Sequence, residues 1–280
     1  MRRITLWVLM LVAVASVSTA QQTNEEYVSK MEKEHATDEP IASPASQLAP
    51  EVEIFAQQAP YAGIEGKDIA GYVAHPKSEV PKVGLIVIHE WWGLNDNVKA
   101  MARRLAGAGY LALAVDLYEG EVAEDRDEAS RLARGSGERT EQILDNLGQA
   151  IEHLRSAGVE RIGVIGWCFG GGWSLRTALA FPDKVDAAVI YYGRLTTDKA
   201  ELEALSSPVL GIFGALDKGI PVEAVREFEA ALDALDKEAA IHIYEDADHA
   251  FANPSGTRYN EEAAEDAWAK TLAFFDENLR

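Results

Sequence analysis

The only cysteine of the chain, Cys168, lies in the sequence GWCFG at positions 166–170. The pattern G-x-[SC]-x-G is typical of a tight turn from a strand into a helix, which holds a nucleophile clear of the sheet edge. The required context is present, because residues 161–168 favour a strand and residues 170–181 favour a helix. The amino end of a helix also stabilises a thiolate. We therefore predict that Cys168 is a nucleophile rather than an inert buried cysteine.

The base that activates such a thiol is expected downstream, because the chain order in folds with this turn is nucleophile, acid, histidine. Only two histidines, His242 and His249, follow Cys168. His242 lies inside the run 239–245, which favours a strand. His249 follows that run, in a loop at its carboxyl end, and is the predicted base.

The acid that orients the histidine is predicted to be Asp217, which ends the strand-like run 208–217. A turn or a helix-capping role is the alternative for this residue. Asp246 and Asp248 lie closer to His249 in the sequence. Neighbours on one loop seldom point at each other's rings, so the chain order favours Asp217.

Glu90 ends the otherwise apolar run 83–90, and a carboxylate at the end of a buried strand is costly unless it is paired. A solvated strand-end glutamate is the alternative to a functional group beside the Cys168 thiol, and we favour the functional group. An oxyanion hole in such a fold uses backbone N–H groups after the nucleophile and after an early strand. These would be the N–H groups of Phe169 and Trp91.

The elements that must position these residues alternate between strand and helix from about residue 60 onward. Strands are expected at 69–76, 83–90, 111–117, 161–168, 185–193, 208–217 and 239–245, and helices at 97–110, 138–157, 170–181, 221–235 and 261–279. Such alternation predicts an α/β fold with a mostly parallel central sheet and helices on both faces. The working residues of such sheets lie at the carboxyl ends of the strands.

The first twenty residues have the pattern of a signal peptide: a basic start, an apolar run, and the small residues Ser18 and Ala20 before the cleavage point. The run is short for a bilayer, which needs about 20 apolar residues. We expect cleavage near Ala20 and an exported protein, periplasmic or secreted. Residues 21–58 are expected to be a linker or N-terminal arm, in which 23–35 suits a short helix. Residues 59–280 are the expected catalytic domain.

The chain has 280 residues with 46 acidic and 26 basic side chains, a formal net charge of −20. This balance argues against a nucleic acid or an anionic membrane as partner, because both need a basic face. One cysteine cannot form an intrachain disulfide, and a chain of this length buries enough surface without one. A monomer that acts on a small molecule, with no membrane contact beyond export, is expected.

From about residue 60 to 278 the chain resembles the dienelactone hydrolase family of α/β hydrolases. The resemblance is carried by IHEWWG around Glu90, GWCFGGG around Cys168, YYG at 191–193, GALD at Asp217 and HAFANP at His249. It implies a triad of Cys168, Asp217 and His249, a sheet of about eight strands, and no cofactor or metal. It also implies that Glu90 holds the thiol in the resting enzyme and helps to deprotonate it when substrate binds.

Dienelactone-cleaving members of that family hold the substrate carboxylate with two arginines, one of them in an R-x-x-A-x-K-L pattern. The sequence RDEASRL at 126–132 is similar and makes Arg126 a substrate-binding candidate, with a solvated helix arginine as the alternative. The second arginine would lie four residues beyond the histidine, where this chain has Asn253. That departure weakens the expectation of dienelactone itself. Arg258, in the following loop, could take the place of this second arginine.

A cysteine nucleophile restricts the substrate. The tetrahedral intermediate can expel either the thiolate, with a pKa of about 8.5, or the substrate oxygen. Enol, phenol and thiol leaving groups compete far better than alkoxides. We therefore predict a carboxylic ester hydrolase, carboxymethylenebutenolidase-like, that cleaves enol-lactones or esters through a cysteine acyl-enzyme.

Three alternatives remain open. One is a general aryl-ester or thioester hydrolase of the same fold. The others belong to different classes: a thiol redox protein or a non-catalytic binding protein. A redox role is disfavoured because the chain has no second cysteine to resolve an oxidised thiol. The complete set of nucleophile, base and acid argues against a binding protein.

Overall fold

The computed structural model describes residues 23–38, 42 and 49–280, so the predicted signal peptide lies outside the described residues. The strands are β1 (Ile54–Ile64), β2 (Lys67–Pro76), β3 (Val83–Ile88), β4 (Leu111–Ala114), β5 (Arg161–Trp167), β6 (Ala187–Tyr191), β7 (Val209–Gly214) and β8 (Ala239–Tyr244). The helices are α1 (Asn24–Glu34), α2 (Asp96–Gly107), α3 (Arg126–Glu138), α4 (Thr140–Ser156), α5 (Phe169–Ala180), α6 (Lys199–Leu202), α7 (Val222–Asp233) and α8 (Glu261–Leu279).

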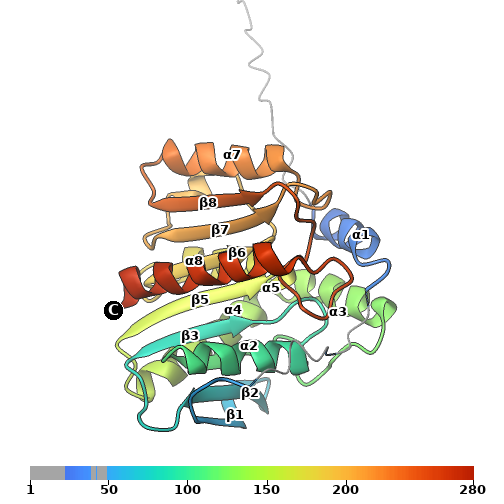
Figure 1. Cartoon of the computed structure of the whole chain (residues 1–280). Helices are drawn as coiled ribbons and strands as arrows, with labels where there is room; N and C mark the ends of the chain where they lie inside the picture. Colours follow the sequence, from blue (N-terminus) through green and yellow to red (C-terminus); the bar gives the residue numbers. More distant parts are fainter. Residues whose placement is uncertain (1–22, 39–41, 43–48) are drawn as a thin grey trace, which may run out of the picture.

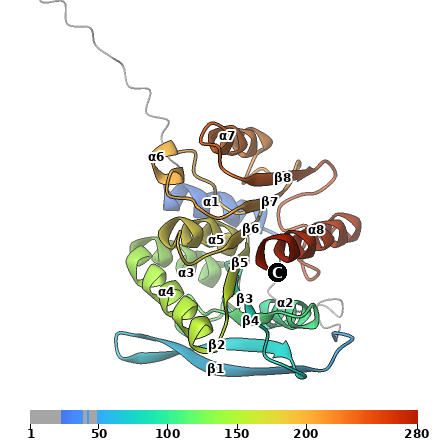
Figure 2. The same ribbon diagram turned by 90° about the vertical axis from the view of Figure 1, so that its left-hand side faces the viewer.

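The strands form one eight-stranded sheet with the order β1-β2-β4-β3-β5-β6-β7-β8 (Figure 1). Strands β3 to β8 are parallel to their neighbours, whereas β2 pairs antiparallel with both β1 and β4. Helices α4 and α5 cover one face, and α2 and α8 cover the other (Figure 2). The predicted α/β class, with a mostly parallel sheet between two helical layers, is confirmed.

The central strands are buried because both faces of the sheet are covered. Every residue of β4, β6 and β7 is buried, which explains their nearly continuous apolar sequences. Each predicted strand has an observed counterpart, but β3 ends at Ile88 and β7 ends at Gly214. Glu90 and Asp217 therefore lie in the loops just beyond the strands, at the carboxyl edge where the sheet opens.

Strand β1 is not predicted by the sequence, and it places the start of the domain at Ile54 rather than at residue 59. It pairs only with β2 at the edge of the sheet, and its register shifts between Pro60 and Ala62. An edge strand tolerates a proline, because one side of its backbone needs no partner. The irregular exposure along it removes the alternation that would have revealed a strand.

The expected N-terminal arm contains α1, which packs on the domain instead of serving only as a tether. The helix begins with a capping box, in which Thr23 accepts from the N–H of Glu26 and Glu26 accepts from the N–H of Thr23. Its apolar residues Tyr27, Val28 and Met31 are buried. Figure 1 shows α1 (blue) beyond the carboxyl ends of the strands, near α3.

Helices α1 and α3 are joined by charged side chains. Arg134 of α3 donates to Glu25 at 3.0 Å and to Glu32 at 2.8 Å. The amide of Asn24 also donates to the carbonyl of Arg134 at 3.2 Å. Because these groups are mostly half exposed, each ion pair stabilises the contact only modestly. No helix in the described part of the chain is both long enough and apolar enough to cross a membrane.

Candidate active site

Cys168 lies on a strained turn between β5 and α5. Its φ of +53° falls in the left-handed region, which is unusual for a residue other than glycine and typical of strain held at a functional site. A Cβ on Gly170 would overlap the carbonyl oxygen of Ile88, and one on Gly166 would overlap Gly170 itself. The turn therefore needs both glycines, which explains the GWCFG sequence and confirms the predicted strand–turn–helix context.

His249 and Asp217 form a buried pair across two loops. The Nδ1 atom of His249 lies 2.7 Å from Oδ2 of Asp217, and neither side chain is exposed to solvent. The other carboxylate oxygen of Asp217 accepts from the N–H groups of Gly219 and Ile220, at 2.7 and 2.9 Å. The rival Asp248 instead caps its own loop, accepting from the N–H of His249. The structure thus places the predicted base against the predicted acid.

The thiol and the base form a charge-stabilised couple. Burial would raise the pKa of Cys168, but the charge of His249 and hydrogen bonds from His249 and His35 lower it to about 6. Burial would lower the pKa of His249, but the charges of Asp217 and Cys168 raise it well above its usual range. Both shifts favour a thiolate on Cys168 beside an imidazolium on His249, and the thiolate is the reactive form of a cysteine.

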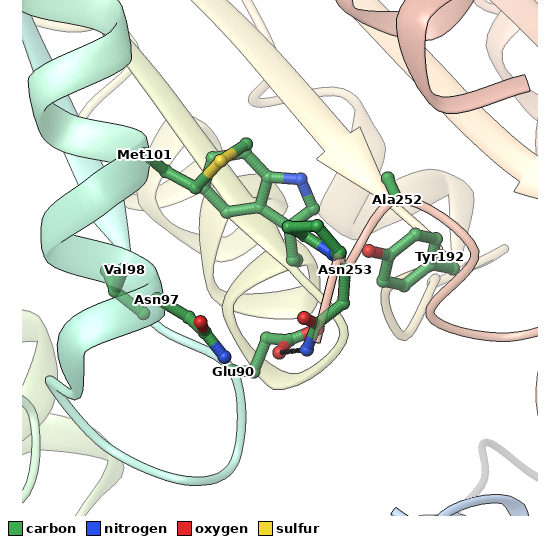
Figure 3. Close-up of a pocket in the computed structure, with 9 residues that line it drawn as sticks. Glu90, Asn97, Val98, Met101, Tyr192, Ala252 and Asn253 are labelled. Atoms are coloured by element: carbon green, nitrogen blue, oxygen red, sulfur yellow. Dashed lines mark hydrogen bonds between the residues drawn. The ribbon is translucent and has the colours of Figure 1, made fainter. Parts of the chain in front are cut away.

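Glu90 is buried beside the site and is held by Asn253. Nδ2 of Asn253 donates to Oε2 of Glu90 at 2.7 Å (Figure 3), while Oε1 of Glu90 has no hydrogen-bond partner among the described residues. Burial and the charge of Cys168 raise the pKa of Glu90 to about 7. The carboxyl group therefore lies close enough for the charge of the thiolate to affect its pKa. Its hydrogen bond, however, is to the amide of Asn253 and not to the sulfur of Cys168.

The backbone N–H groups of Trp91 and Phe169 are available as an oxyanion hole. Phe169 is the first residue of α5, where an N–H has no acceptor within the helix. Neither N–H donates a hydrogen bond to another described residue. His89 helps to order this region, because its ring stacks on that of Phe169 at 5.6 Å and its Nε2 accepts from the N–H of Leu117.

The thiol is covered by the N-terminal helix. Met31 Sδ lies 3.8 Å and His35 Nε2 lies 3.5 Å from Cys168 Sγ, and the cysteine is 0% exposed. The ring of His35 stacks on Trp91 with centroids 4.7 Å apart and meets His249 edge-on at 5.1 Å. The family resemblance implies that Glu90 lies beside the thiol. In this structure His35 also lies beside it.

A second histidine–aspartate pair holds His35 in place. Its Nδ1 lies 2.7 Å from Oδ2 of Asp38, and both side chains are almost fully buried. Asp38 also accepts from Thr257 and Arg258, both at 2.7 Å. Burial would raise the pKa of Asp38, but the hydrogen bond and charge of His35 hold it well below its usual range. Thr257 and Arg258, in the loop after β8, thus hold the end of the N-terminal segment against the domain.

The two substrate-binding candidates have different surroundings. Asn253 lines the site, as described, whereas Arg126 is exposed at the start of α3 and donates to the carbonyl of Ala36 at 2.6 Å. Arg126 therefore touches the segment that follows α1, and its role toward substrate stays a prediction. Arg258 points toward Glu34 and Asp38 and is paired with both.

Sequence reasoning missed His35, Met31 and Asp38 as members of the site. One signal was present, because HATD at 35–38 places an aspartate three residues after a histidine and so allows a local pair. Nothing local indicates that this pair reaches Cys168, which is more than a hundred residues away in the chain.

A small, largely apolar hollow opens next to Glu90. Figure 3 shows Met101, Val98 and Asn97 from α2 on one side of it, and Tyr192, Ala252 and Asn253 on the other. Trp167, which precedes the nucleophile, also lines it. The hollow thus lies between α2 and the loop that follows the catalytic histidine.

Several known proteins are similar to this chain in sequence. The model of the dienelactone hydrolase family matches residues 69–279. A Saccharolobus solfataricus protein provisionally named carboxymethylenebutenolidase is 32% identical over 248 residues, covering 75% of this chain and 94% of its own. Protein usf of Aquifex pyrophilus is 33% identical over 222 residues, covering 76% and 95%.

A solved structure extends the similarity to the fold. A Klebsiella pneumoniae protein provisionally described as a dienelactone hydrolase superposes with a TM-score of 0.73 at 30% identity, covering 80% of this chain and 99% of its own. The family match at residues 69–279 spans Cys168, Asp217 and His249, whose geometry is described above. The chain belongs to the dienelactone hydrolase family.

Proposed function

We propose that this hydrolase cleaves ester or enol-lactone bonds through a cysteine acyl-enzyme. The observation that carries the proposal is the buried 2.7 Å pair of His249 and Asp217, which converges on a thiol held at positive φ. Family membership supports hydrolysis, and the depressed pKa of Cys168 supports a thiolate nucleophile.

The proposed reaction has two halves. The Cys168 thiolate attacks the ester carbonyl, while the N–H groups of Trp91 and Phe169 stabilise the oxyanion. His249, oriented by Asp217, then protonates the departing oxygen, and a thioester remains on sulfur. A water molecule that gives its proton to His249 attacks the thioester and releases the acid.

Sulfur chemistry favours acidic leaving groups. The intermediate of the first half expels whichever group is the weaker base, and a thiolate leaves more easily than an alkoxide. Enols, phenols and thiols compete with the thiolate, so enol-lactones and aryl esters suit the site. The apolar hollow beside Glu90, lined by Met101 and Val98, supports an uncharged apolar group on one side of the scissile bond.

Substrate entry requires a movement of the N-terminal segment. Cys168 is fully covered by Met31 and His35, so no ester carbonyl reaches the sulfur while α1 occupies this position. The described arrangement is therefore the closed form of the proposed enzyme.

The test uses a phenyl and an ethyl ester of the same acid with the wild-type protein and Cys168→Ser. We expect the serine variant to lose orders of magnitude in kcat/KM on both esters, because its hydroxyl is much harder to deprotonate. The ratio of phenyl to ethyl turnover should shrink, because a serine oxygen no longer leaves more easily than an alkoxide.

Two outcomes would contradict the proposal. A serine variant as active as the wild type would remove Cys168 from the mechanism. Peroxide consumption by wild type without ester turnover would favour the thiol redox alternative. Circular dichroism of both proteins controls for folding.

We further propose that the protein is exported and processed near Ala20. The basic start, apolar run and small residues at 18 and 20 support this. The mature chain would then begin at Gln21, just before the Thr23 cap of α1. Amino-terminal sequencing of protein recovered from its own host tests the point, and a cytosolic chain that still begins at Met1 would contradict it.

A further inference from the structure

The N-terminal segment brings a second imidazole to the catalytic sulfur. One nitrogen each of His35 and His249 and the sulfur of Cys168 all lie within 4.8 Å of one another. Both histidines use Nδ1 for an aspartate, at 2.7 Å in each case, so the nitrogen that each turns toward the sulfur is Nε2. All three side chains are buried.

This arrangement matches the surroundings of histidine ligands in metal sites. Such a histidine commonly binds the metal through one nitrogen and donates the other N–H to a carboxylate, which fixes its tautomer and orientation. Asp38 and Asp217 are the carboxylates here. Nε2 of His249 is fully buried and has no hydrogen-bond partner among the described residues, so in the neutral ring its lone pair is free to bind a cation.

The distances fit tetrahedral coordination. Bonds of about 2.3 Å to sulfur and about 2.0 Å to nitrogen place N and S ligands about 3.5 Å apart and two S ligands about 3.8 Å apart. The structure has 3.5 Å between His35 Nε2 and Cys168 Sγ, and 3.8 Å between Met31 Sδ and the same sulfur. The ligand nitrogen of His249 lies within 4.8 Å of the His35 nitrogen and the Cys168 sulfur and must move closer to complete the set.

We propose that Cys168, His35 and His249, with Met31 as a fourth ligand, form a binding site for a soft d¹⁰ cation of the Cu⁺ and Zn²⁺ class. Thiolate and imidazole suit both ions, whereas a thioether favours Cu⁺, so Cu⁺ is the preferred occupant. Binding displaces the proton that Cys168 and His249 share, which leaves to solvent, and changes no oxidation state.

Occupation of this site would have two consequences. The sulfur is no longer free to attack an ester, so the metal-bound form is inactive. The ion also ties α1 to the sheet loops, because two ligands come from the N-terminal segment and two from the loops. The binding measurement needs no substrate, so it stands or falls independently of the proposed hydrolysis.

The experiment measures anaerobic binding of Cu⁺ and of Zn²⁺ to the full chain by competition with chromogenic chelators. One ion per chain is expected, and Co²⁺ should give a thiolate-to-metal charge-transfer band. His35→Ala should weaken binding of both ions by about 100-fold or more, since even loss of a second-shell partner costs about 10- to 100-fold. His153→Ala, on α4 far from the site, is the matched control and should bind as wild type does.

Two further variants sharpen the test. Asp38→Asn should lower affinity for both ions by about 10- to 100-fold, because it removes the carboxylate that orients His35. Met31→Leu, which keeps the apolar volume, should lower Cu⁺ affinity at least tenfold and leave Zn²⁺ affinity nearly unchanged.

Specific results would overturn the proposal. Absence of stoichiometric binding by wild type, or equal binding by wild type and His35→Ala, would show that the cluster is only a hydrogen-bonded cover on the thiol. An equal effect of Met31→Leu on both ions would remove Met31 from the ligand set and the preference for Cu⁺ with it. Circular dichroism separates these outcomes from misfolding.

Discussion

Two regions of the molecule present a histidine–aspartate pair to the same sulfur, and they are built in different ways. His249 and Asp217 come from loops after β8 and β7, which are neighbouring parallel strands at one edge of the sheet, with β8 outermost. His35 and Asp38 lie three residues apart on the N-terminal segment. Both pairs are 2.7 Å apart and buried, so pair geometry alone does not distinguish them.

The difference lies in what anchors each pair. The sheet pair is held by the strand ladder and by two backbone N–H groups that donate to Asp217. The N-terminal pair is held by side chains: Arg258 and Thr257 donate to Asp38, and Arg134 holds the preceding helix through Glu32. Side-chain contacts of this kind can open at modest cost, whereas separating β7 from β8 would break a ladder of backbone hydrogen bonds. In the proposed mechanism the first pair carries out the chemistry, and the second covers the sulfur and must move away for substrate to enter.

The largest expected effect contrasts the two histidines in metal-free protein. His249→Ala should lower kcat/KM by about 10⁴- to 10⁶-fold, as removal of a triad member does. His35→Ala should change it by less than about tenfold, because the sheet pair remains complete. Ester hydrolysis in the presence of a chelator measures both. Equal losses would show that the two pairs act together and would break the comparison.

Arg126 tests whether the N-terminal segment or the substrate is its partner. If it binds a substrate carboxylate, a charge-assisted contact of about 1.5–3 kcal/mol is lost in Arg126→Ala. The kcat/KM for carboxylate-bearing lactones should then fall by about 10- to 150-fold, while neutral aryl esters are little affected. An equal change on both classes would indicate that its bond to the Ala36 carbonyl is what matters.

Arg258 tests how firmly the N-terminal segment closes the site. Its guanidinium is 16% exposed and pairs with Asp38 at 2.7 Å and Glu34 at 3.4 Å. Arg258→Ala should lose about 1.5 kcal/mol of docking and raise the open population about tenfold. Alkylation of Cys168, which is covered in the closed form, should accelerate by that factor. Arg226→Ala, which breaks the exposed pair with Glu229, is the control and should not accelerate it.

The smallest expected effect is a shift in pH dependence. The pKa of Cys168 is about 6, so its alkylation rate should fall as pH drops through that value, because the thiol gains a proton. In His35→Ala the loss of one hydrogen bond to sulfur should move this limb to higher pH. Glu90→Gln removes the neighbouring group with a pKa of about 7, so the fall in alkylation rate that remains in this variant belongs to the sulfur. An unmoved limb would mean that His35 does not stabilise the thiolate.

Much of the sheet region could be predicted from local patterns. The GWCFG turn is determined by its glycines, because only they avoid overlap with the passing backbone at 166 and 170. Parallel strands bring their carboxyl ends to one edge, so the loops with Asp217 and His249 had to meet there. Strand β1 escaped prediction because an edge strand with a proline and irregular burial lacks the alternation that marks most strands.

The sequence by itself determined the fold class, the tight turn that carries Cys168 and the chain order of Cys168, Asp217 and His249, because short-range periodicity and turn chemistry encode these features. It did not determine the role of residues 23–38. The amphipathic pattern of α1 predicts a helix but not the surface it covers, and the pair of His35 and Asp38 is satisfied locally wherever it lies. Only the tertiary structure placed that pair over Cys168. The docking of this segment depends on Arg258, which bonds to Asp38, and on Arg134, which bonds to Glu32. Each arginine lies over a hundred residues from its partner, and local sequence carries no record of such distant contacts.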